Sequence, residues 1–213
     1  MLRDLPEDVA GLVAGASRRR RYPANEVIVR EDDPSDSVHV ITRGHVAIVI
    51  ATPLGRQLTY TILGPDESFG ELSVLSDSPR TATARALDAT ETLALHRTDL
   101  DRLRREHPRV NDAMIRVLCA QVTRLSARLA EHLYLPVEAR VRRRLLEVCR
   151  VYETATIPLS QDDLAELAGA ARATVNRVLR QDEADGVVTL SRRQITVLDR
   201  AGLTRRAQVD ELG

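Results

Sequence analysis

The sequence has very few aromatic residues and no lysine. Aromatic residues make up 2% of its 213 residues, with no tryptophan and one phenylalanine, so any hydrophobic core must be mainly aliphatic. All 31 basic residues are arginine, which we read as the compositional bias of a GC-rich genome rather than as chemistry. The 31 acidic residues balance them, so no net charge indicates nucleic acid or an acidic membrane, although a local basic patch would suffice for DNA.

Cysteines and long hydrophobic runs are also scarce. The two cysteines, Cys119 and Cys149, are too few for a four-thiolate iron–sulfur cluster, and no CxxC pair occurs. The five histidines form no recognisable ligand pair, so we expect no metal site and no haem. No apolar run approaches the roughly 18 residues of a membrane helix, and the chain does not open on a signal-peptide pattern. These absences predict a soluble, cytoplasmic protein without a membrane partner.

Alternation of apolar residues predicts a β-rich first half. An amphipathic helix is expected over residues 5–16, and the basic run Arg18–Arg21 after it is interpreted as a solvated edge. Strands are expected at Val27–Val29, Val38–Val40, Val46–Ile50, Leu58–Leu63 and Thr90–His96. Short strands at this spacing favour a small barrel or β-roll.

The most specific pattern of this half is a Gly-Glu pair followed nine residues later by a single Arg. Gly70 lets a backbone come close to a ligand, because it has no Cβ. Glu71 can accept hydrogen bonds from sugar hydroxyls, and the Arg80 guanidinium fits phosphate oxygens bidentately. Thr81 would complete an anion cradle, so the stretch predicts a compact phosphorylated sugar. The alternative is a structural ion pair between Glu71 and Arg80 in a β-turn.

The second half is helical. A short helix, 99–106, is expected to stop at Pro108, and a long helix follows over 109–132 before the break at 133–136. The long helix carries an apolar stripe with heptad-like spacing: Ile115, Leu118, Val122, Leu125 and Leu129. Such a stripe favours a parallel homodimer, with packing against the chain's own barrel as the alternative. A further helix is expected over 137–152.

A helix-turn-helix pattern lies near the C-terminus. Ser160 is a plausible N-cap with Asp163 three residues on, Gly169 opens a tight turn, and a second helix starts at Arg172. Two short strands, 187–190 and 195–198, then read as a β wing. Any small helical hairpin would be the alternative, but arginines concentrate on the second helix and the wing.

The Gly-Glu and Arg stretch resembles the phosphate-binding cassette of cyclic-nucleotide-binding domains, in which FGEL is followed by PR and small residues. The resemblance implies that Glu71 holds the ribose 2′-hydroxyl and that Arg80 holds the cyclic phosphate. It also implies ligand contacts from Gly70, Leu72 and Thr81.

The long helix bears on the identity of the base. In family members that respond to cAMP, this helix usually presents a Thr and then a Ser or Asn to the adenine, and here the matching pair is Leu125 and Ser126. Ser126 can hydrogen-bond a base and Leu125 cannot. The resemblance implies cAMP or cGMP as an allosteric ligand. The apolar Leu125 keeps open the alternative that the protein responds to another effector or to none.

Over nearly its whole length the chain is similar to the CRP/FNR family of bacterial transcription regulators. The fold class implied is α+β, with a cyclic-nucleotide-binding β-roll (1–108), a dimerisation helix and hinge (109–135) and a winged helix-turn-helix (136–213). The partners implied are a second copy of the chain, palindromic double-stranded DNA and RNA polymerase. No Ser/His/Asp arrangement and no P-loop points to an enzyme, although a nucleotide-binding protein without a DNA role remains a third hypothesis.

The resemblance to the family's recognition helix is partial. The candidate DNA-contacting residues are Ser160, Arg172, Ala173, Thr174, Asn176, Arg177 and Arg180. Arg177 would be bidentate to a guanine in the major groove. Ala173 stands where most members carry a Glu that reads a base, and Ala171 replaces a common phosphate-contacting Ser. The family's usual half-site sequence should therefore not be assumed for this chain.

Overall fold

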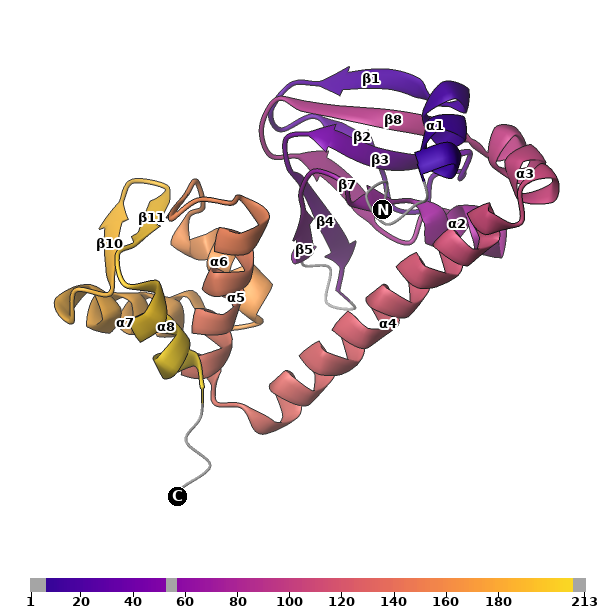
Figure 1. Cartoon of the computed structure of the whole chain (residues 1–213). Coiled ribbons are helices and arrows are strands. Elements are labelled where there is room, and N and C mark those ends of the chain that lie inside the picture. The colour runs from indigo at the N-terminus through magenta and orange to yellow at the C-terminus, as the bar shows by residue number, and fades with distance from the viewer. Residues whose placement is uncertain (1–6, 53–56, 209–213) are drawn as a thin grey trace. The chain divides into compact units, whose positions relative to one another are not determined.

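The computed structural model describes residues 7–52 and 57–208, and the chain divides into two compact units, residues 1–123 and 124–213 (Figure 1). The first helix, α1 (Glu7–Ala16), ends where the sequence predicts, and the expected first residues, Leu5 and Pro6, lie outside the described residues. Each unit has its own core, and we take them in turn.

Two antiparallel four-stranded sheets form the first unit, which confirms the predicted β-roll. One sheet has the order β1-β8-β3-β6 and the other the order β2-β7-β4-β5. The strands are β1 (Arg18–Tyr22), β2 (Val27–Val29), β3 (Ser37–Arg43), β4 (Val46–Ala51), β5 (Gln57–Leu63), β6 (Ser68–Phe69), β7 (Thr83–Ala86) and β8 (Thr90–His96).

The basic run Arg18–Arg21 is part of an edge strand, where the sequence suggested only a solvated edge. β1 pairs with β8 along its full length, and its four arginines are exposed. Arg19 and Arg21 both reach Glu91 on β8, at 3.2 and 2.9 Å. Four consecutive arginines show no alternation of apolar and polar residues, so only the backbone ladder reveals this strand.

Aliphatic residues fill both cores of this unit, as the scarcity of aromatic residues predicts. Between the sheets, Ile41, Val46, Leu63 and Ala84 pack around Phe69, the single phenylalanine. A second cluster joins the outer face of the first sheet to α1, to α2 (Glu71–Ser76), to α3 (Arg97–Glu106) and to the start of α4 (Arg109–Tyr134).

The long helix α4 continues two residues beyond the predicted end at His132. Its first turns are buried, whereas most of the predicted stripe is exposed: Ile115 by 57%, Val122 by 62%, Leu125 by 54% and Leu129 by 59%. Within the first unit, Ile115 and Val122 of the stripe therefore leave most of their side chains uncovered by the barrel. No helix in the described part of the chain is long and apolar enough to cross a membrane.

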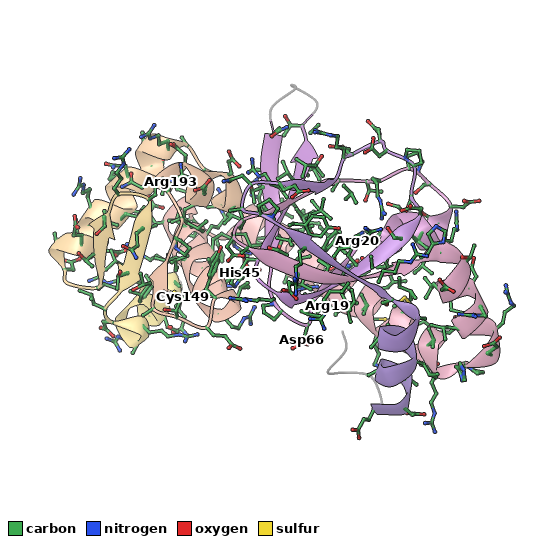
Figure 2. All side chains as sticks on the ribbon, turned by 90° about the horizontal axis from the view of Figure 1, so that it is seen from above. Arg19, Arg20, His45, Asp66, Cys149 and Arg193 are labelled. Carbon is green, nitrogen blue, oxygen red and sulfur yellow. The ribbon has the colours of Figure 1, made fainter. Side chains whose placement is uncertain are left out.

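The second unit packs its helices around α5 and carries a β wing. Its elements are the end of α4, α5 (Val137–Val151), β9 (Thr156–Ile157), α6 (Gln161–Ala168), α7 (Arg172–Ala184), β10 (Val188–Ser191), β11 (Gln194–Val197) and α8 (Arg200–Ala207). β10, β11 and β9 form one antiparallel sheet, and Arg193 lies in the turn of the wing with a φ of 54° (Figure 2). The sequence predicted the helices α5, α6 and α7 and the wing, but not β9 or α8.

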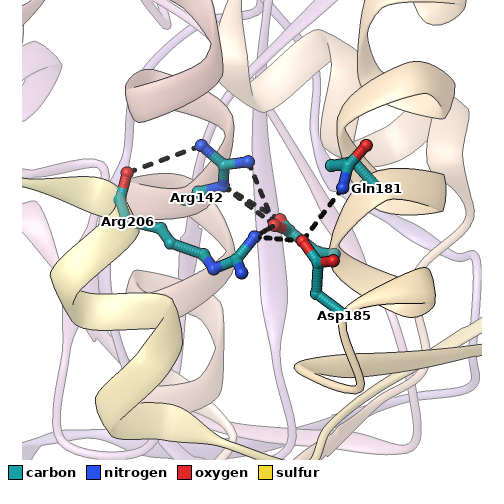
Figure 3. A network of polar contacts seen from close by, with 5 residues as sticks. Arg142, Gln181, Asp185 and Arg206 are labelled. Atoms are coloured by element: carbon teal, nitrogen blue, oxygen red, sulfur yellow. Dashed lines mark hydrogen bonds and ion pairs between the residues drawn. The ribbon is translucent and has the colours of Figure 1, made fainter.

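A buried carboxylate joins three helices of this unit (Figure 3). Asp182 on α7 is 0% exposed, and it accepts hydrogen bonds from Arg142 Nε at 2.9 Å, Arg142 Nη2 at 3.0 Å and Arg206 Nη1 at 3.2 Å. The same Nη1 of Arg206 also reaches Asp185, at 2.7 Å. Because α8 supplies one of the two arginines, this ion network anchors the C-terminal helix to α5 and α7.

Candidate functional site

Gly70 has a conformation that only glycine adopts readily, at the junction of β6 and α2. Its φ is +86°, in the left-handed region. A Cβ at this position would collide with the guanidinium of Arg80 and would lie 3.0 Å from the carbonyl oxygen of Ser37. The cassette is therefore folded so that the backbone at Gly70 touches the side chain of Arg80, ten residues further along the chain.

Glu71 is buried at the first position of α2, with 2% of its surface exposed. The side-chain amide of Gln121, on α4, donates a hydrogen bond to Glu71 Oε1. The long helix thus reaches the cassette within the first unit. Sequence reasoning misses Gln121, because a single glutamine in a long helix carries no signal of its contact.

Arg80 is 3% exposed, and the hydrogen bonds that its guanidinium donates go to neutral oxygens. Its Nη1 donates to the Gly70 carbonyl oxygen at 3.3 Å and its Nη2 donates to Ser37 Oγ at 3.1 Å. The ion pair with Asp36 is long, at 3.5 Å, and the Asp36 side chain is 69% exposed. Burial lowers the pKa of Arg80, while Asp36, Glu71 and Asp33 oppose this shift. Arg80 Nε is buried and has no hydrogen-bond partner among the described residues.

The other predicted ligand residues are exposed. Leu72 is 46% exposed on α2, and Thr81 follows Arg80 with its backbone N–H donating to Ser73 Oγ at 3.3 Å. Leu125 and Ser126 are exposed on α4, in the part of that helix that belongs to the second unit. Of the predicted ligand residues, the structure thus places Gly70 and Arg80 in direct contact, with Glu71 next in the chain.

The second unit contains the predicted helix-turn-helix, α6 and α7. Ser160 caps α6 in a capping box, since its hydroxyl accepts from the Asp163 N–H and the Asp163 carboxylate accepts from the Ser160 N–H at 2.8 Å. Gly169 ends α6 in the left-handed region, with a φ of 57°. Buried residues on α7, among them Val175 and Leu179, hold the second helix against the core.

The predicted DNA-contacting arginines lie exposed on α7, each paired with a carboxylate. Arg172 Nε lies 3.1 Å from Asp162, Arg177 Nη2 lies 2.6 Å from Glu138, and Arg180 Nη1 lies 2.8 Å from Glu183. All three side chains are at least 64% exposed. Exposed ion pairs contribute little to stability, so these arginines can exchange their carboxylates for other anions at low cost.

The remaining predicted residues of α7 differ in their exposure. Ala173 is exposed at the start of the helix, and Thr174 is half-buried. Asn176 donates from Nδ2 to Gln161 Oε1 at 2.8 Å and so links the two helices of the motif. Among the described residues no group of three His, Cys, Asp or Glu side chains is arranged to hold a metal ion.

Two family models match the chain. The cyclic nucleotide-binding domain matches residues 19–107, and the Crp-like helix-turn-helix domain matches residues 127–206. A CRP-like cAMP-activated global transcriptional regulator of Mycobacterium tuberculosis is 30% identical over 194 residues, which cover 88% of this chain and 87% of that protein. The cyclic AMP receptor protein of Thermus thermophilus is 32% identical over 196 residues, covering 92% of this chain and 90% of that protein.

Solved structures share the fold. The c-di-GMP responsive global regulator CLP of Xanthomonas campestris matches with a TM-score of 0.78 at 22% identity, covering 90% of this chain and 99% of that one. These relatives are transcription regulators and not enzymes. With both of its domains matched and its β-roll, long helix and helix-turn-helix in the same order, the chain belongs to the CRP/FNR family of DNA-binding transcription regulators.

Proposed function

We propose that this regulator is a homodimer that binds a palindromic DNA site under the control of a cyclic nucleotide, with cAMP as the first candidate and cGMP as the second. Residues 1–108 would bind the ligand, 109–135 would form the dimer and the hinge, and 136–213 would bind DNA. The protein would act in the cytoplasm together with RNA polymerase. Two relatives are named for cAMP, which supports this choice of ligand.

The burial of Arg80 without a close counter-ion carries the ligand proposal. A guanidinium stays charged at any physiological pH, and burying that charge is costly unless an anion lies close to it. Among the described residues, the ion pair of Arg80 is the long contact with the exposed Asp36, and Nε has no hydrogen-bond partner. A cyclic phosphate would supply both the negative charge and the missing acceptor.

The neighbouring residues suit the rest of the nucleotide. Glu71, beside the cassette turn, would accept a hydrogen bond from the ribose 2′-hydroxyl, and Gly70 would let the ligand approach the backbone. Leu72 and Thr81 would add contacts at the rim. For the base, Ser126 would hydrogen-bond and Leu125 would pack against the ring.

Calorimetric titration of the purified protein with cAMP, with cGMP and with 3′,5′-cyclic-di-GMP tests the ligand. Arg80→Gln should weaken binding of the cyclic nucleotide about 100-fold, because two charge-assisted hydrogen bonds to the phosphate are lost. Arg85→Gln, a change of the same kind on the neighbouring strand β7, is the matched control and should bind as the wild type does. Failure of the wild-type protein to bind any of the three would overturn the ligand proposal.

For DNA, we propose that Arg177 reads a guanine and that Arg172 and Arg180 contact the site from the same helix face. Ser160 and Thr174 would contact phosphates, Asn176 would support the helix pair, and Ala173 would offer a methyl contact to thymine. Arg177→Ala should cost roughly 1–3 kcal/mol and relax the preference at one base pair. With Arg180 on a phosphate, Arg180→Ala should weaken binding to all DNA sites alike. The slope of log affinity against log salt concentration should then fall in magnitude by about one.

Selection of DNA sites from a random library, with and without cAMP, measures the operator and the control by ligand in one experiment. The proposal predicts a palindrome that is enriched more strongly with cAMP. Equal enrichment of the same palindrome with and without cAMP would favour a second function, which is DNA regulation independent of cAMP. The apolar Leu125, at the position proposed to face the base, motivates this alternative. No enrichment in either arm would count against the proposed DNA recognition.

A further inference from the structure

A line of polar side chains crosses the mainly apolar interior of the roll and ends at Arg80. Thr92 Oγ1 on β8 lies 3.1 Å from His39 Nδ1 on β3, and His39 Nε2 lies 3.2 Å from Ser37 Oγ. Ser37 Oγ in turn accepts from Arg80 Nη2 at 3.1 Å. Thr92 is 0% exposed and His39 is 5% exposed, so the line runs through the core.

His39 also reaches Arg80 by a second path. Its ring stacks on Phe69, with 4.9 Å between the ring centroids and 5° between the planes. Phe69 directly precedes Gly70, whose carbonyl oxygen accepts from Arg80 Nη1 at 3.3 Å. The imidazole therefore supports both groups that accept hydrogen bonds from the guanidinium: the Ser37 hydroxyl by a hydrogen bond and the Gly70 carbonyl through the stacked ring.

One arrangement of the protons makes His39 an acceptor for the Ser37 hydroxyl. Arg80 can only donate, so Ser37 Oγ accepts from it and its own proton is free for His39 Nε2 or for Asp36 Oδ1, which lies at 2.8 Å. For Nε2 to accept, the imidazole must be neutral with its proton on Nδ1, donated to Thr92. The pKa of His39 is lowered to about 4, mainly by burial and then by the charge of Arg80, against the opposing effect of Asp36. The charge of Arg20 also lowers the pKa of the His39 ring.

We propose that Ser37 and His39, held by Thr92, are positioning residues that orient the Arg80 guanidinium toward the cyclic phosphate. This inference rests on the ligand proposed above. Arg80 has several rotatable bonds and a long ion pair, so without these acceptors its guanidinium would sample several orientations. The nucleotide would then have to order the guanidinium on binding, which would weaken affinity for the phosphate without altering the contacts to the ribose.

The sharpest test compares two threonines of β8. Thr92→Val removes the partner of His39, while Thr90→Val is the same change two residues away, at a residue that is 1% exposed and bonded to Asp88 and His45 instead. Calorimetry should show cAMP binding about tenfold weaker in Thr92→Val and in Ser37→Ala, and unchanged in Thr90→Val. Adenosine, which keeps the ribose and lacks the phosphate, should bind all four proteins equally.

The effect should also depend on Arg80. In an Arg80→Gln background, Ser37→Ala should cause no further loss of affinity, since the group that Ser37 orients is gone. Equal weakening by the two threonine variants, equal loss for adenosine and cAMP, or additivity with Arg80→Gln would each overturn the positioning role.

A measurement without nucleotide separates this inference from the proposed function. Nitrogen chemical shifts of the His39 ring should show a neutral ring protonated on Nδ1, titrating near pH 4. In Arg80→Gln the midpoint should move upward, because a positive charge that opposes protonation is removed. An unchanged His39 midpoint in Arg80→Gln, or a proton on Nε2, would contradict the proposed hydrogen-bond line from Thr92 to Arg80. Absence of cAMP binding alone would count only against cAMP as the ligand.

Discussion

At the scale of single residues, Gly70 is the position where one methyl group should have the largest effect on the ligand site. Gly70→Ala would strain the backbone by about 1–2 kcal/mol at its φ of +86° and would push the Arg80 guanidinium away. We expect a lower unfolding free energy by chemical denaturation and cAMP affinity at least roughly tenfold weaker. Gly186→Ala has a similar φ of +70° but nothing within 4 Å of the added Cβ, so it should lose stability alone. Equal cAMP affinity in the two variants would contradict the clash.

His39 should make the stability of the protein sensitive to mild acid. Its folded-state pKa of about 4 lies below its ordinary value of 6.5, so between these values the unfolded chain binds a proton that the folded chain does not. Stability should therefore fall as the pH falls through this interval, by roughly 3 kcal/mol in total. Urea unfolding at a series of pH values should show this fall in the wild type and a flatter profile in His39→Gln. Parallel profiles would count against a neutral buried His39.

At the scale of elements, the recognition helix α7 begins without a side-chain cap. Its N-cap is Ala171, in an extended conformation with no capping hydrogen bond, whereas α6 begins with the capping box of Ser160. Ala171→Ser should add the missing acceptor for the first turn and stabilise the protein by about 1 kcal/mol. Thermal unfolding measures this gain, and Ala173→Ser, two positions into the helix, is the control that should give none. A gain of equal size in both variants would rule out capping as the cause.

Elements that depend on alternation or caps are predictable here, and those that depend on distant partners are not. The strands at Val46 and Thr90 and the start of α6 at Ser160 follow from local pattern. β1 does not, because its four arginines become a strand only through pairing with β8. α8 is likewise held by Arg206 on the buried Asp182, a contact across 24 positions of sequence that no local pattern reveals.

At the scale of the whole molecule, the exposed stripe of α4 is the expected dimer surface. Burying each Leu or Val of the stripe in a second copy would contribute roughly 1.5–3 kcal/mol. Val122→Glu with Leu129→Glu should therefore give a monomer in analytical ultracentrifugation and weaken binding to a palindromic site. Ala120→Glu with Ala127→Glu adds the same charge to exposed positions of the same helix outside the stripe and should stay dimeric. A dimeric stripe variant would contradict this surface.

The sequence by itself determined the family, the order of its parts and the residues of the cassette, because these depend on local spacing: a glycine beside a carboxylate, an arginine nine residues later, and a capped helix followed by a tight turn and a second helix near the C-terminus. The tertiary structure alone decided what surrounds those residues. Ser37, His39 and Thr92 meet Arg80 only because β3 and β8 pair and direct the three side chains to one face of their sheet. Burial and hydrogen-bond partners across a fold arise from chain packing, and these set the charge environment of the proposed phosphate site.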